Sequence, residues 1–447
     1  MADLEKLTEK MLHAAKHAGA EAADAIVMKG DSLSIEVANG ALEHAERAEG
    51  IDLGLRVLLG QRSAVVSVSD ASDATIAVMA ERAVAMAKAA PEDPYVGLAE
   101  AGQLATTWDV EALELVDPAE PATPEALKDM ALEAEAAASA VRGVNKVDSA
   151  GASASASSIH LATSNGFSGG YGRTSTGLYC TAISGEGLEM ERDYKGDSRV
   201  FAADMISAGE IGRIAGERAV ALRGASQPPT GAFPVLFDER VSSTLIGHLM
   251  AAINGRAVAR GVSWLKDAMG EQVLPEGMNL VENPFRKRVG GSKPFDGEGL
   301  ATARRTWVEN GALKGWILDL ASGRQLGMQS TGNAARGAGS APSPSVGNLT
   351  LTPGQKSRDE LIADMGTGLI ITSMIGSSVN PNTGEYSRGA SGFWVENGEI
   401  IRPVNECTVA GNLREMLQSL TAANDGQAHL SRVVPSLLVE GLTIAGS

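Results

Sequence analysis

His248 is the residue of this sequence that comes nearest to a catalytic or metal-ligating side chain. It is one of only six histidines, and it lies within the stretch 233–260, FPVLFDERVSSTLIGHLMAAINGRAVAR. The apolar run 233–237 predicts a short buried strand, and the apolar residues that follow recur at helical spacing. We expect a helix whose start and end are set by Ser242, Ser243, Asn254 and Gly255.

A zinc hydrolase needs about three nitrogen, sulfur or oxygen ligands and a carboxylate that activates water. Two histidines one turn apart on a helix, with a glutamate beside the first, provide most of this set. The positions before His248 hold Ser243 and Thr244, so neither a second histidine nor a glutamate is present. His13 and His17 have ligand spacing without an apparent third ligand, and we interpret them as a solvated helix face. The sequence does not predict a zinc site in this chain.

Nucleophilic catalysis has little more support. No Gly-x-Ser-x-Gly pattern stands between a strand and a helix, and Cys407 has no adjacent histidine or helix start to lower its pKa. We expect Cys407 to be a buried or semi-buried thiol. Cys180, the second cysteine, is far from it in sequence, so we expect two reduced thiols. A metal-independent hydrolase that uses a serine or Cys407 stays an alternative, which loss of peptide cleavage in Cys407→Ala would favour.

Three glycine-rich runs invite comparison with phosphate-binding loops. None completes a P-loop or a GxGxxG pattern after a strand. We interpret them as turns and as backbone that approaches another segment closely; they are 330–333, 336–339 and 365–368.

The elements that must position these residues fall into two halves. Helices are expected over 3–18, 74–90, 123–142 and 207–222 of the first half. Strands are expected over 25–29, 32–38, 41–47, 51–59 and 63–69, with turns at Asn39-Gly40 and Asn165-Gly166. The small-residue stretch 150–187 is interpreted as further strands, and a flexible linker is the alternative.

The segment 223–231, RGASQPPTG, is the best domain boundary in the chain. Beyond it the sequence indicates mostly strands, with Asn-Gly hairpin turns at 310–311 and 397–398. Helix caps are expected at Ser357 with Glu360 and at Asn412 with Glu415. The fold class is therefore α+β. An N-terminal α/β-sandwich-like domain is expected over 1–224, and a mostly β C-terminal domain with one central helix over 230–447.

Length and charge narrow the functional classes. A chain of 447 residues exceeds what one hydrophobic core usually supports, which agrees with two domains. The formal charge of −17 disfavours nucleic-acid binding, and we interpret the basic triplet 286–288 as a solvated loop. No apolar run is long enough to cross a membrane and the N-terminus is charged, so we expect a soluble, cytoplasmic protein without membrane contact.

Ordered motifs run through both halves of the chain. They are Gly40-Ala41-Leu42-Glu43, Gly54-Leu55-Arg56-Val57, Ile246-Gly247-His248-Leu249, Ile253-Asn254-Gly255, Pro294-Phe295-Asp296-Gly297-Glu298-Gly299, Ser330-Thr331-Gly332-Asn333-Ala334, Val379-Asn380-Pro381-Asn382-Thr383-Gly384-Glu385 and Thr408-Val409-Ala410-Gly411-Asn412-Leu413. Together they are far more specific than a single glycine pattern. The chain resembles the TldD/PmbA family, and specifically its PmbA (TldE) branch, over nearly its whole length.

This resemblance implies a role without catalytic residues. TldD-type subunits carry His-Glu-x-x-x-His on the central helix and a later cysteine, and they bind zinc for peptide hydrolysis. On this chain the three helix positions fall at Ser243, Thr244 and His248, and the cysteine position at Ala410, three residues after Cys407. The resemblance thus implies no metal, no cofactor and no catalytic residue here, with zinc in a TldD-type partner.

The implied complex is a TldD–TldE heterodimer, a zinc metalloprotease that trims or degrades unfolded peptides, including peptide-antibiotic precursors and antitoxins. This chain would shape the chamber or bind substrate. Whether it forms a homodimer when the partner is absent is left open. A stand-alone binding protein that acts on a regulator without proteolysis is a further alternative. The legacy family name, modulator of DNA gyrase, gains no support from the charge balance.

Overall fold

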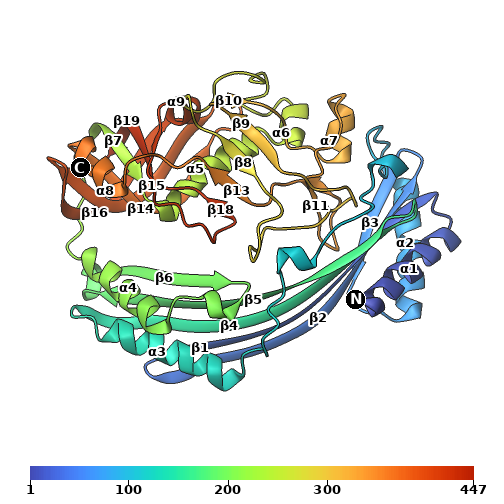
Figure 1. Cartoon of the computed structure of the whole chain (residues 1–447), viewed down its shortest axis with the longest axis horizontal. Coiled ribbons are helices and arrows are strands. Elements are labelled where there is room, and N and C mark those ends of the chain that lie inside the picture. The colour runs from blue at the N-terminus through green and yellow to red at the C-terminus, as the bar shows by residue number, and fades with distance from the viewer. Residues whose placement is uncertain (447) are drawn as a thin grey trace.

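The first half of the chain forms one large antiparallel sheet. The computed structural model describes residues 1–446, without the side chain of Ser377. The strand order is β3-β2-β1-β4-β5-β6, and the long strands bow around the second half of the chain (Figure 1). The strands are β1 Ala22–Ala38, β2 Ala41–Leu59, β3 Arg62–Val68, β4 Val144–Thr163, β5 Ser168–Ser184 and β6 Glu191–Arg199.

The strands are longer than the sequence pattern predicts. We expected breaks between 29 and 32 and between 47 and 51, and both expectations are wrong. Gly30 and Gly50 lie opposite each other in the β1–β2 register, so the pairing runs through both glycines without interruption. The stretch 150–187 lies mainly in β4 and β5, which are joined at Asn165-Gly166. This confirms the interpretation as strands and excludes the alternative of a flexible linker. The Asn39-Gly40 turn is confirmed by positive φ at both residues.

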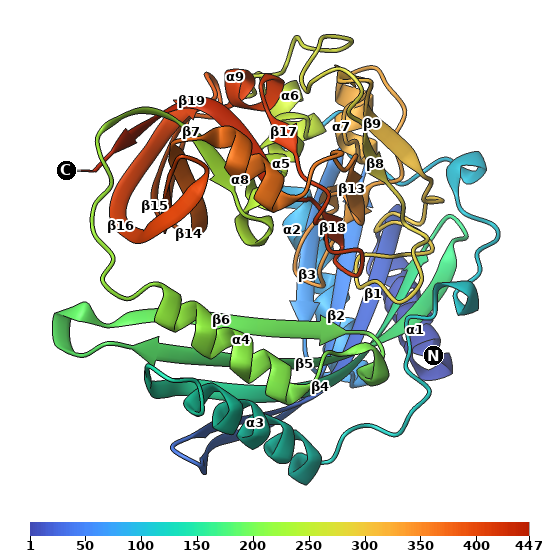
Figure 2. The ribbon, with the colours of Figure 1, turned by 60° about the vertical axis from the view of Figure 1, so that its left-hand side comes forward.

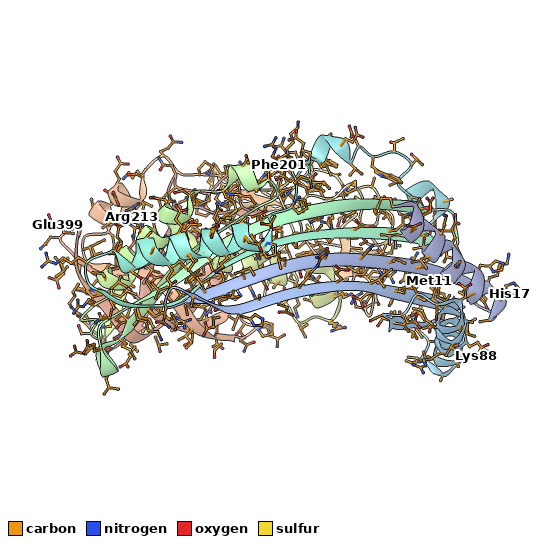
Figure 3. All side chains as sticks on the ribbon, turned by 90° about the horizontal axis from the view of Figure 1, so that it is seen from below. Met11, His17, Lys88, Phe201, Arg213 and Glu399 are labelled. Carbon is orange, nitrogen blue, oxygen red and sulfur yellow. The ribbon has the colours of Figure 1, made fainter. Side chains whose placement is uncertain are left out.

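Helices cover the two ends of the outer face of this sheet. Helices α1 (Ala2–His17) and α2 (Asp73–Ala89) pack on one end, and α3 (Pro124–Ser139) and α4 (Ala208–Ala221) pack on the other. Each set shares a core of small and aliphatic residues with the strands. Between the two sets, no helix of the described residues covers the strands (Figure 3). Single-turn helices follow at Ala101–Gln103, Glu111–Leu113, Gly187–Glu189 and Ala202–Asp204.

The second half of the chain builds two further sheets around α5. In one, the order is β16-β15-β14-β7-β19-β17, and β16 also pairs with β19, so the sheet closes on itself. The other has the order β10-β9-β8-β13-β18, and β11 pairs with β12. Figure 2 shows this half above the long strands, joined to them through the segment between α4 and β7.

The bounds of the elements in this half are as follows. The strands are β7 Gly231–Phe237, β8 Leu280–Glu282, β9 Arg305–Glu309, β10 Ala312–Leu313, β11 Ala334–Ala335, β12 Ser343–Pro344, β13 Leu349–Leu351, β14 Gly368–Val379, β15 Glu385–Glu396, β16 Glu399–Asn412, β17 Thr421–Ala422, β18 Arg432–Val433 and β19 Leu437–Ala445. The helices are α5 Glu239–Ala252, α6 Gly255–Ala259, α7 Leu320–Gln325, α8 Arg358–Met365 and α9 Leu413–Gln418. The mixed α+β fold class is thereby confirmed.

Some helix ends differ from those expected. The cap of α5 is Asp238, whose side chain accepts from the Arg240 amide, and Ser242 lies inside the helix, so the expected serine cap is wrong. Asn254 caps α6. The sequence pattern revealed neither α6 nor α7, which are both short helices. The Ser357–Glu360 capping box is present, and Asn412 caps α9. No helix among residues 1–446 has the length and apolar character needed to cross a membrane.

The glycine-rich run 336–339 lies against the large sheet, as its composition predicts. A Cβ added at Gly54 of β2 would lie 2.2 Å from the backbone oxygen of Ala338, a distance that requires backbone to move. We expect Gly54→Ala to lower the free energy of unfolding by about 1–3 kcal/mol through overpacking. Gly50→Ala is the matched control, because a Cβ there meets nothing within 4 Å. Urea denaturation measures both, and equal effects would contradict a tight contact at Gly54.

Candidate functional site

The helix that carries His248 lies at the centre of the C-terminal core. Its buried face, with Leu245, Ile246 and Leu249, belongs to the largest hydrophobic cluster of the described residues. The helix follows directly on β7, whose residues 235–237 pair with β14. The position of His248 is therefore fixed by packing on the sheet below it.

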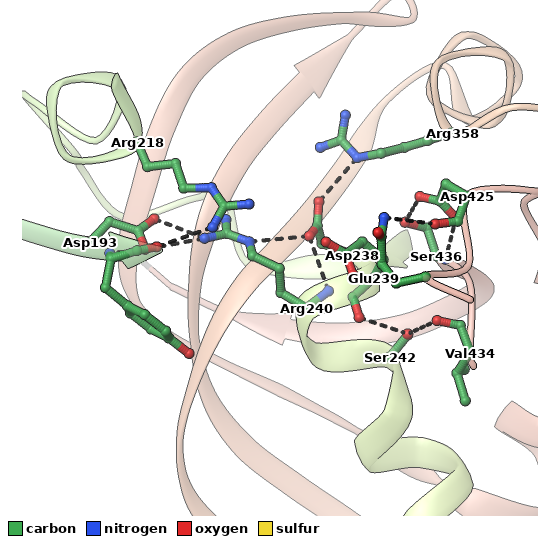
Figure 4. A network of polar contacts seen from close by, with 12 residues as sticks. Asp193, Arg218, Asp238, Glu239, Arg240, Ser242, Arg358, Asp425, Val434 and Ser436 are labelled. Carbon is green, nitrogen blue, oxygen red and sulfur yellow. Dashed lines mark hydrogen bonds and ion pairs between the residues drawn. The ribbon is translucent and has the colours of Figure 1, made fainter. Parts of the chain in front are cut away.

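A polar network holds the first turn of α5 (Figure 4). Arg240 donates from Nε to Asp238 at 3.2 Å and from Nη1 to both carboxylate oxygens of Asp193 on β6, at 3.1 and 3.0 Å. Arg358 of α8 donates to the other Asp238 oxygen at 3.0 Å. Burial and the neighbouring Asp238 raise the pKa of Glu239. The network connects the start of α5 to the N-terminal sheet.

His248 itself lies beside an aromatic ring. Its imidazole meets Tyr386 of β15 edge to face, with the ring centroids 5.8 Å apart. Its Nε2 is buried, and no described residue forms a hydrogen bond with it. Burial lowers the pKa of His248, and the charge of Arg388 lowers it further. The side chain is therefore a neutral, packed imidazole at neutral pH.

The other positions of the expected motif carry no ligand chemistry. Thr244 donates its hydroxyl to the Val241 carbonyl at 2.7 Å, one turn back in the same helix. Ala410 of β16 pairs with Ser387, whereas Tyr386 pairs with Gly411. Because successive residues of a strand point to opposite faces, the Ala410 side chain lies on the face away from His248. The structure thus does not bring Ala410 together with the helix positions Ser243, Thr244 and His248.

The donor set around α5 does not fit a zinc ion. A tetrahedral zinc site takes about three protein ligands from cysteine, histidine and carboxylate side chains. Around α5 the chain offers one imidazole, and no group of three or more such residues anywhere in 1–446 is arranged to hold a metal ion. The rings of His13 and His17 on α1 lie edge to face, with their centroids 4.6 Å apart. Helix α1 belongs to the first half of the chain and α5 to the second. No metal-assisted step can be derived from these residues.

Both cysteines are free and buried, which agrees with the expectation of two reduced thiols and of a buried or semi-buried Cys407. Cys407 donates to the Ala390 carbonyl at 3.2 Å, and burial raises its pKa to about 11. Burial raises the pKa of Cys180 to about 12. Neither thiol is available as a thiolate at neutral pH, which weighs against a nucleophilic role.

Thiol labelling checks this directly. We expect neither cysteine of the native protein to react with a disulfide reagent within an hour at pH 7.5, and both to react in guanidinium chloride. Stoichiometric labelling of native Cys407, located by comparison with Cys180→Ser and Cys407→Ser variants, would contradict the buried-thiol account.

A buried ionic cluster joins the two halves of the chain, and the sequence did not reveal it. Asp24 of β1 accepts from Nε of Arg56 on β2 at 2.7 Å, and its other oxygen accepts from Arg336 of the second half. All three side chains are at most 5% exposed. Burial opposes the charge of Asp24, but the two guanidinium groups hold its pKa below the usual value. The sequence signal was a single charged residue within each of two short apolar stretches, 22–28 and 53–59.

The Pro294–Gly299 motif places two more buried acids nearby. Asp296 accepts from the backbone amides of Glu298, Leu300 and Ala334, which fixes the loop. Glu298 accepts from the Leu320 amide at 2.9 Å. Burial, and then the charge of Asp296, raises the pKa of Glu298 to about 8. Burial also raises the pKa of Asp296. These acids organise the loop that faces Arg56.

The basic triplet 286–288 lies in a loop with Lys287 and Arg288 exposed, as expected, but it also forms ion pairs that the sequence did not predict. Lys287 and Arg288 both pair with Glu114, at 2.7 Å each, and Arg288 also pairs with Asp204. Arg286 donates to the Leu430 carbonyl at 2.9 Å. Lys287 and Arg288 therefore bind acids of the first half, and the local sequence gave no sign of this because the partners lie more than 80 residues away.

Comparison with known proteins assigns the chain to a family. Models of the PmbA/TldA metallopeptidase domain 1, central domain and C-terminal domain match residues 23–87, 117–223 and 230–446. A metalloprotease PmbA from Escherichia coli O157:H7 is 33% identical over 97% of this chain and 94% of that protein. A PmbA homolog from Haemophilus influenzae is 35% identical over the same shares of the two chains.

Solved structures agree with this assignment. A Bacteroides thetaiotaomicron protein described as a modulator of DNA gyrase is similar with a TM-score of 0.90 and 25% identity, over 100% of both chains. TldE from Thermococcus kodakarensis has the same fold, with a TM-score of 0.83 and 20% identity over 98% of this chain and 100% of that one. This chain belongs to the PmbA/TldD family of metallopeptidases, in its PmbA branch.

Proposed function

We propose that this chain is the non-catalytic, PmbA/TldE-type subunit of a zinc metalloprotease whose catalytic zinc is held by a TldD-type partner. The complex cleaves unfolded peptides, and peptide-antibiotic precursors and antitoxins are the substrate classes we expect. The observation that carries the proposal is the donor set of α5. It presents one neutral imidazole, His248, with Ser243 and Thr244 at the positions where a second ligand and a base are needed.

Two surfaces support a role in shaping the chamber and holding peptide. The face of the large sheet that turns toward the second half of the chain exposes serines of β4, including Ser155 and Ser157. The outer edge of β2 carries no paired strand before Leu53, where its pairing with β3 begins. An unpaired edge offers backbone donors and acceptors to an extended chain, the recognition mode called β-augmentation.

The proposal extends to partners and location. We expect a heterodimer with a TldD-type subunit in the cytoplasm, with neither nucleic acid nor membrane as a partner. The negative formal charge of −17 supports the first exclusion, because phosphate binding depends on basic surfaces. A metal-independent hydrolase built on Cys407 is disfavoured by the burial and raised pKa of that thiol.

Reconstituted peptide cleavage tests the proposal. The full chain is purified alone, mixed with a TldD-type subunit, and assayed on an unfolded peptide by mass spectrometry. We expect no cleavage by this chain alone, cleavage by the mixture, and unchanged cleavage when the mixture contains His248→Ala. Cleavage by this chain alone would overturn the proposal. Tight association with a peptide or regulator, without cleavage by the mixture, would instead support a stand-alone binding protein.

A further inference from the structure

A pocket between the two halves of the chain is lined by cations and hydroxyls. Its volume is about 260 Å³, and its walls include Arg173, Arg199, Arg288 and His429. Further lining residues are Ser155 and Ser157 of β4, on the sheet face that turns toward the second half of the chain. None of the lining residues carries a carboxylate, although the formal charge of the whole chain is −17.

Several donors in this pocket are unused. Arg199 donates from Nε to the two carboxylate oxygens of Asp197, at 2.9 and 3.0 Å. Neither of its terminal nitrogens has a hydrogen-bond partner among the described residues. Arg288 donates from Nε to Glu114 and from Nη1 to Asp204, which leaves Nη2 without one. Ser155 and Ser157 are exposed, and their hydroxyls have no hydrogen-bond partner in the described chain. The pocket therefore presents an array of free N–H and O–H groups.

The positive charge of the pocket is only partly compensated. Asp197 pairs with Arg199 and lies 3.7 Å from His429, and Glu114 and Asp204 pair with Arg288. Arg173 has no carboxylate partner within residues 1–446. Its two terminal nitrogens donate to the backbone carbonyls of Gly290 and Ser292, which orient the guanidinium at the wall without neutralising it. A fixed guanidinium with free neighbouring donors favours a bound anion.

We propose that this pocket is a carboxylate-binding subsite that anchors an extended peptide by its free C-terminal carboxylate. The inference rests on the proposed function, since it assumes that peptides enter the space between the two halves of the chain. Arginine forks and hydroxyls match a carboxylate in shape and charge. The volume admits a carboxylate together with part of the residue that bears it. The same donors also suit a glutamate side chain, so the experiment separates the two sources of carboxylate.

Fluorescence anisotropy on the full chain, without proteolysis, tests the subsite. Three fluorescein-labelled unfolded decapeptides of one sequence are compared: the free acid, its C-terminal amide, and the amide with glutamate as its last residue. We expect the free acid to bind about tenfold more tightly than the plain amide, the effect of one charge-assisted contact. Equal binding of the glutamate amide and the free acid would assign the pocket to side-chain carboxylates and overturn the C-terminal anchor.

A matched pair of variants places the effect in the pocket. Ser157→Asp adds a carboxylate to the pocket wall, and Ser153→Asp adds the same charge to the same face of β4, about 13 Å away by strand rise. That separation exceeds the screening length of about 8 Å at physiological salt. We expect Ser157→Asp to remove the preference for the free acid and Ser153→Asp to preserve it. Both serines are exposed, so neither change disturbs the core.

The outcomes separate the subsite from the proposed function. Tight binding of acid and amide with equal affinity would overturn the subsite and leave peptide handling intact. Binding of none of the peptides would overturn the subsite, whereas the cleavage assay with the TldD-type subunit decides the proposed function. Retention of the acid preference in Ser157→Asp would place the anchor elsewhere and overturn this assignment.

Discussion

Asp24→Asn is expected to lower the free energy of unfolding by about 3–5 kcal/mol, because it leaves two buried guanidinium groups without their anion. Asp24 is 2% exposed and is the only carboxylate that pairs with Arg56 or Arg336 among the described residues. Asparagine keeps the shape and loses the charge. Two hydrogen-bond donors of Arg336, Nε and Nη2, already lack partners, so the cluster has no spare acceptor. The effect falls on the contact between the large sheet and the second half of the chain.

Urea denaturation at pH 7 measures this effect against a matched control. Asp31 lies on the same strand and pairs with Arg47 at 3.1 Å, but both side chains are about half exposed. Asp31→Asn is expected to cost less than about 1 kcal/mol, as exposed ion pairs do. Equal stability of wild type and Asp24→Asn would show that the buried cluster does not hold the two halves together.

Glu298 is expected to make the stability of the protein depend on pH in the neutral range. Its pKa in the folded protein is about 8, raised by burial and by Asp296 from an ordinary value of 4.5. The folded chain thus retains a proton that the unfolded chain loses between these two values. The stabilising contribution is complete below about pH 4.5 and is lost as the pH rises through 8, at up to about 1.4 kcal/mol per pH unit.

Glu298→Gln removes this titration and keeps an oxygen for the Leu320 amide. We expect the variant to be more stable than wild type at pH 8.5, by on the order of 3 kcal/mol, and similar to it at pH 5. Chemical denaturation from pH 5 to 8.5 shows the difference as a flatter profile. Glu385→Gln, at an exposed position, serves as control and should follow the wild-type profile. A profile of Glu298→Gln parallel to that of wild type would exclude Glu298 as the titrating group.

Local signals in the sequence were sufficient for much of the fold. The Asn-Gly turns at 39–40, 310–311 and 397–398 were predictable because their backbone needs positive φ, which all six residues adopt. The Ser357 capping box and the α3 start at Thr123 were predictable because a single side chain satisfies a helix-end amide. Each of these features depends on residues within a few positions of one another.

Features set by distant contacts were not predictable in this way. Arg336 meets Asp24 across 312 positions, and no pattern near either residue indicates the other. Asp238, which caps α5, also binds Arg358 of α8, a partner 120 residues away that no local pattern indicates. The glycines at 30 and 50 did not break their strands because they pair with each other, and Gly30 also pairs with Ser157 of β4.

The candidate site was predictable in its chemistry and less so in its geometry. The absence of a second histidine and of a glutamate next to His248 on the helix follows from the sequence alone, whereas the partly buried imidazole with a buried Nε2 required the structure. The position of Ala410 relative to α5 required the strand register, because a shift of one residue moves a side chain to the opposite face of the sheet. The cationic pocket brings together residues from β4, β5, β6 and two later loops, so no local pattern announces it.

Metal content per subunit tests the central claim most directly. This chain and a TldD-type subunit are co-purified and then separated in mild denaturant. Each subunit is reconstituted with zinc before elemental analysis. The account predicts about one zinc per TldD-type subunit and none above background on this chain. It also predicts that a chelator leaves the melting temperature of this chain unchanged. Stoichiometric zinc on this chain, lost together with its thermal stability on chelation, would contradict the account.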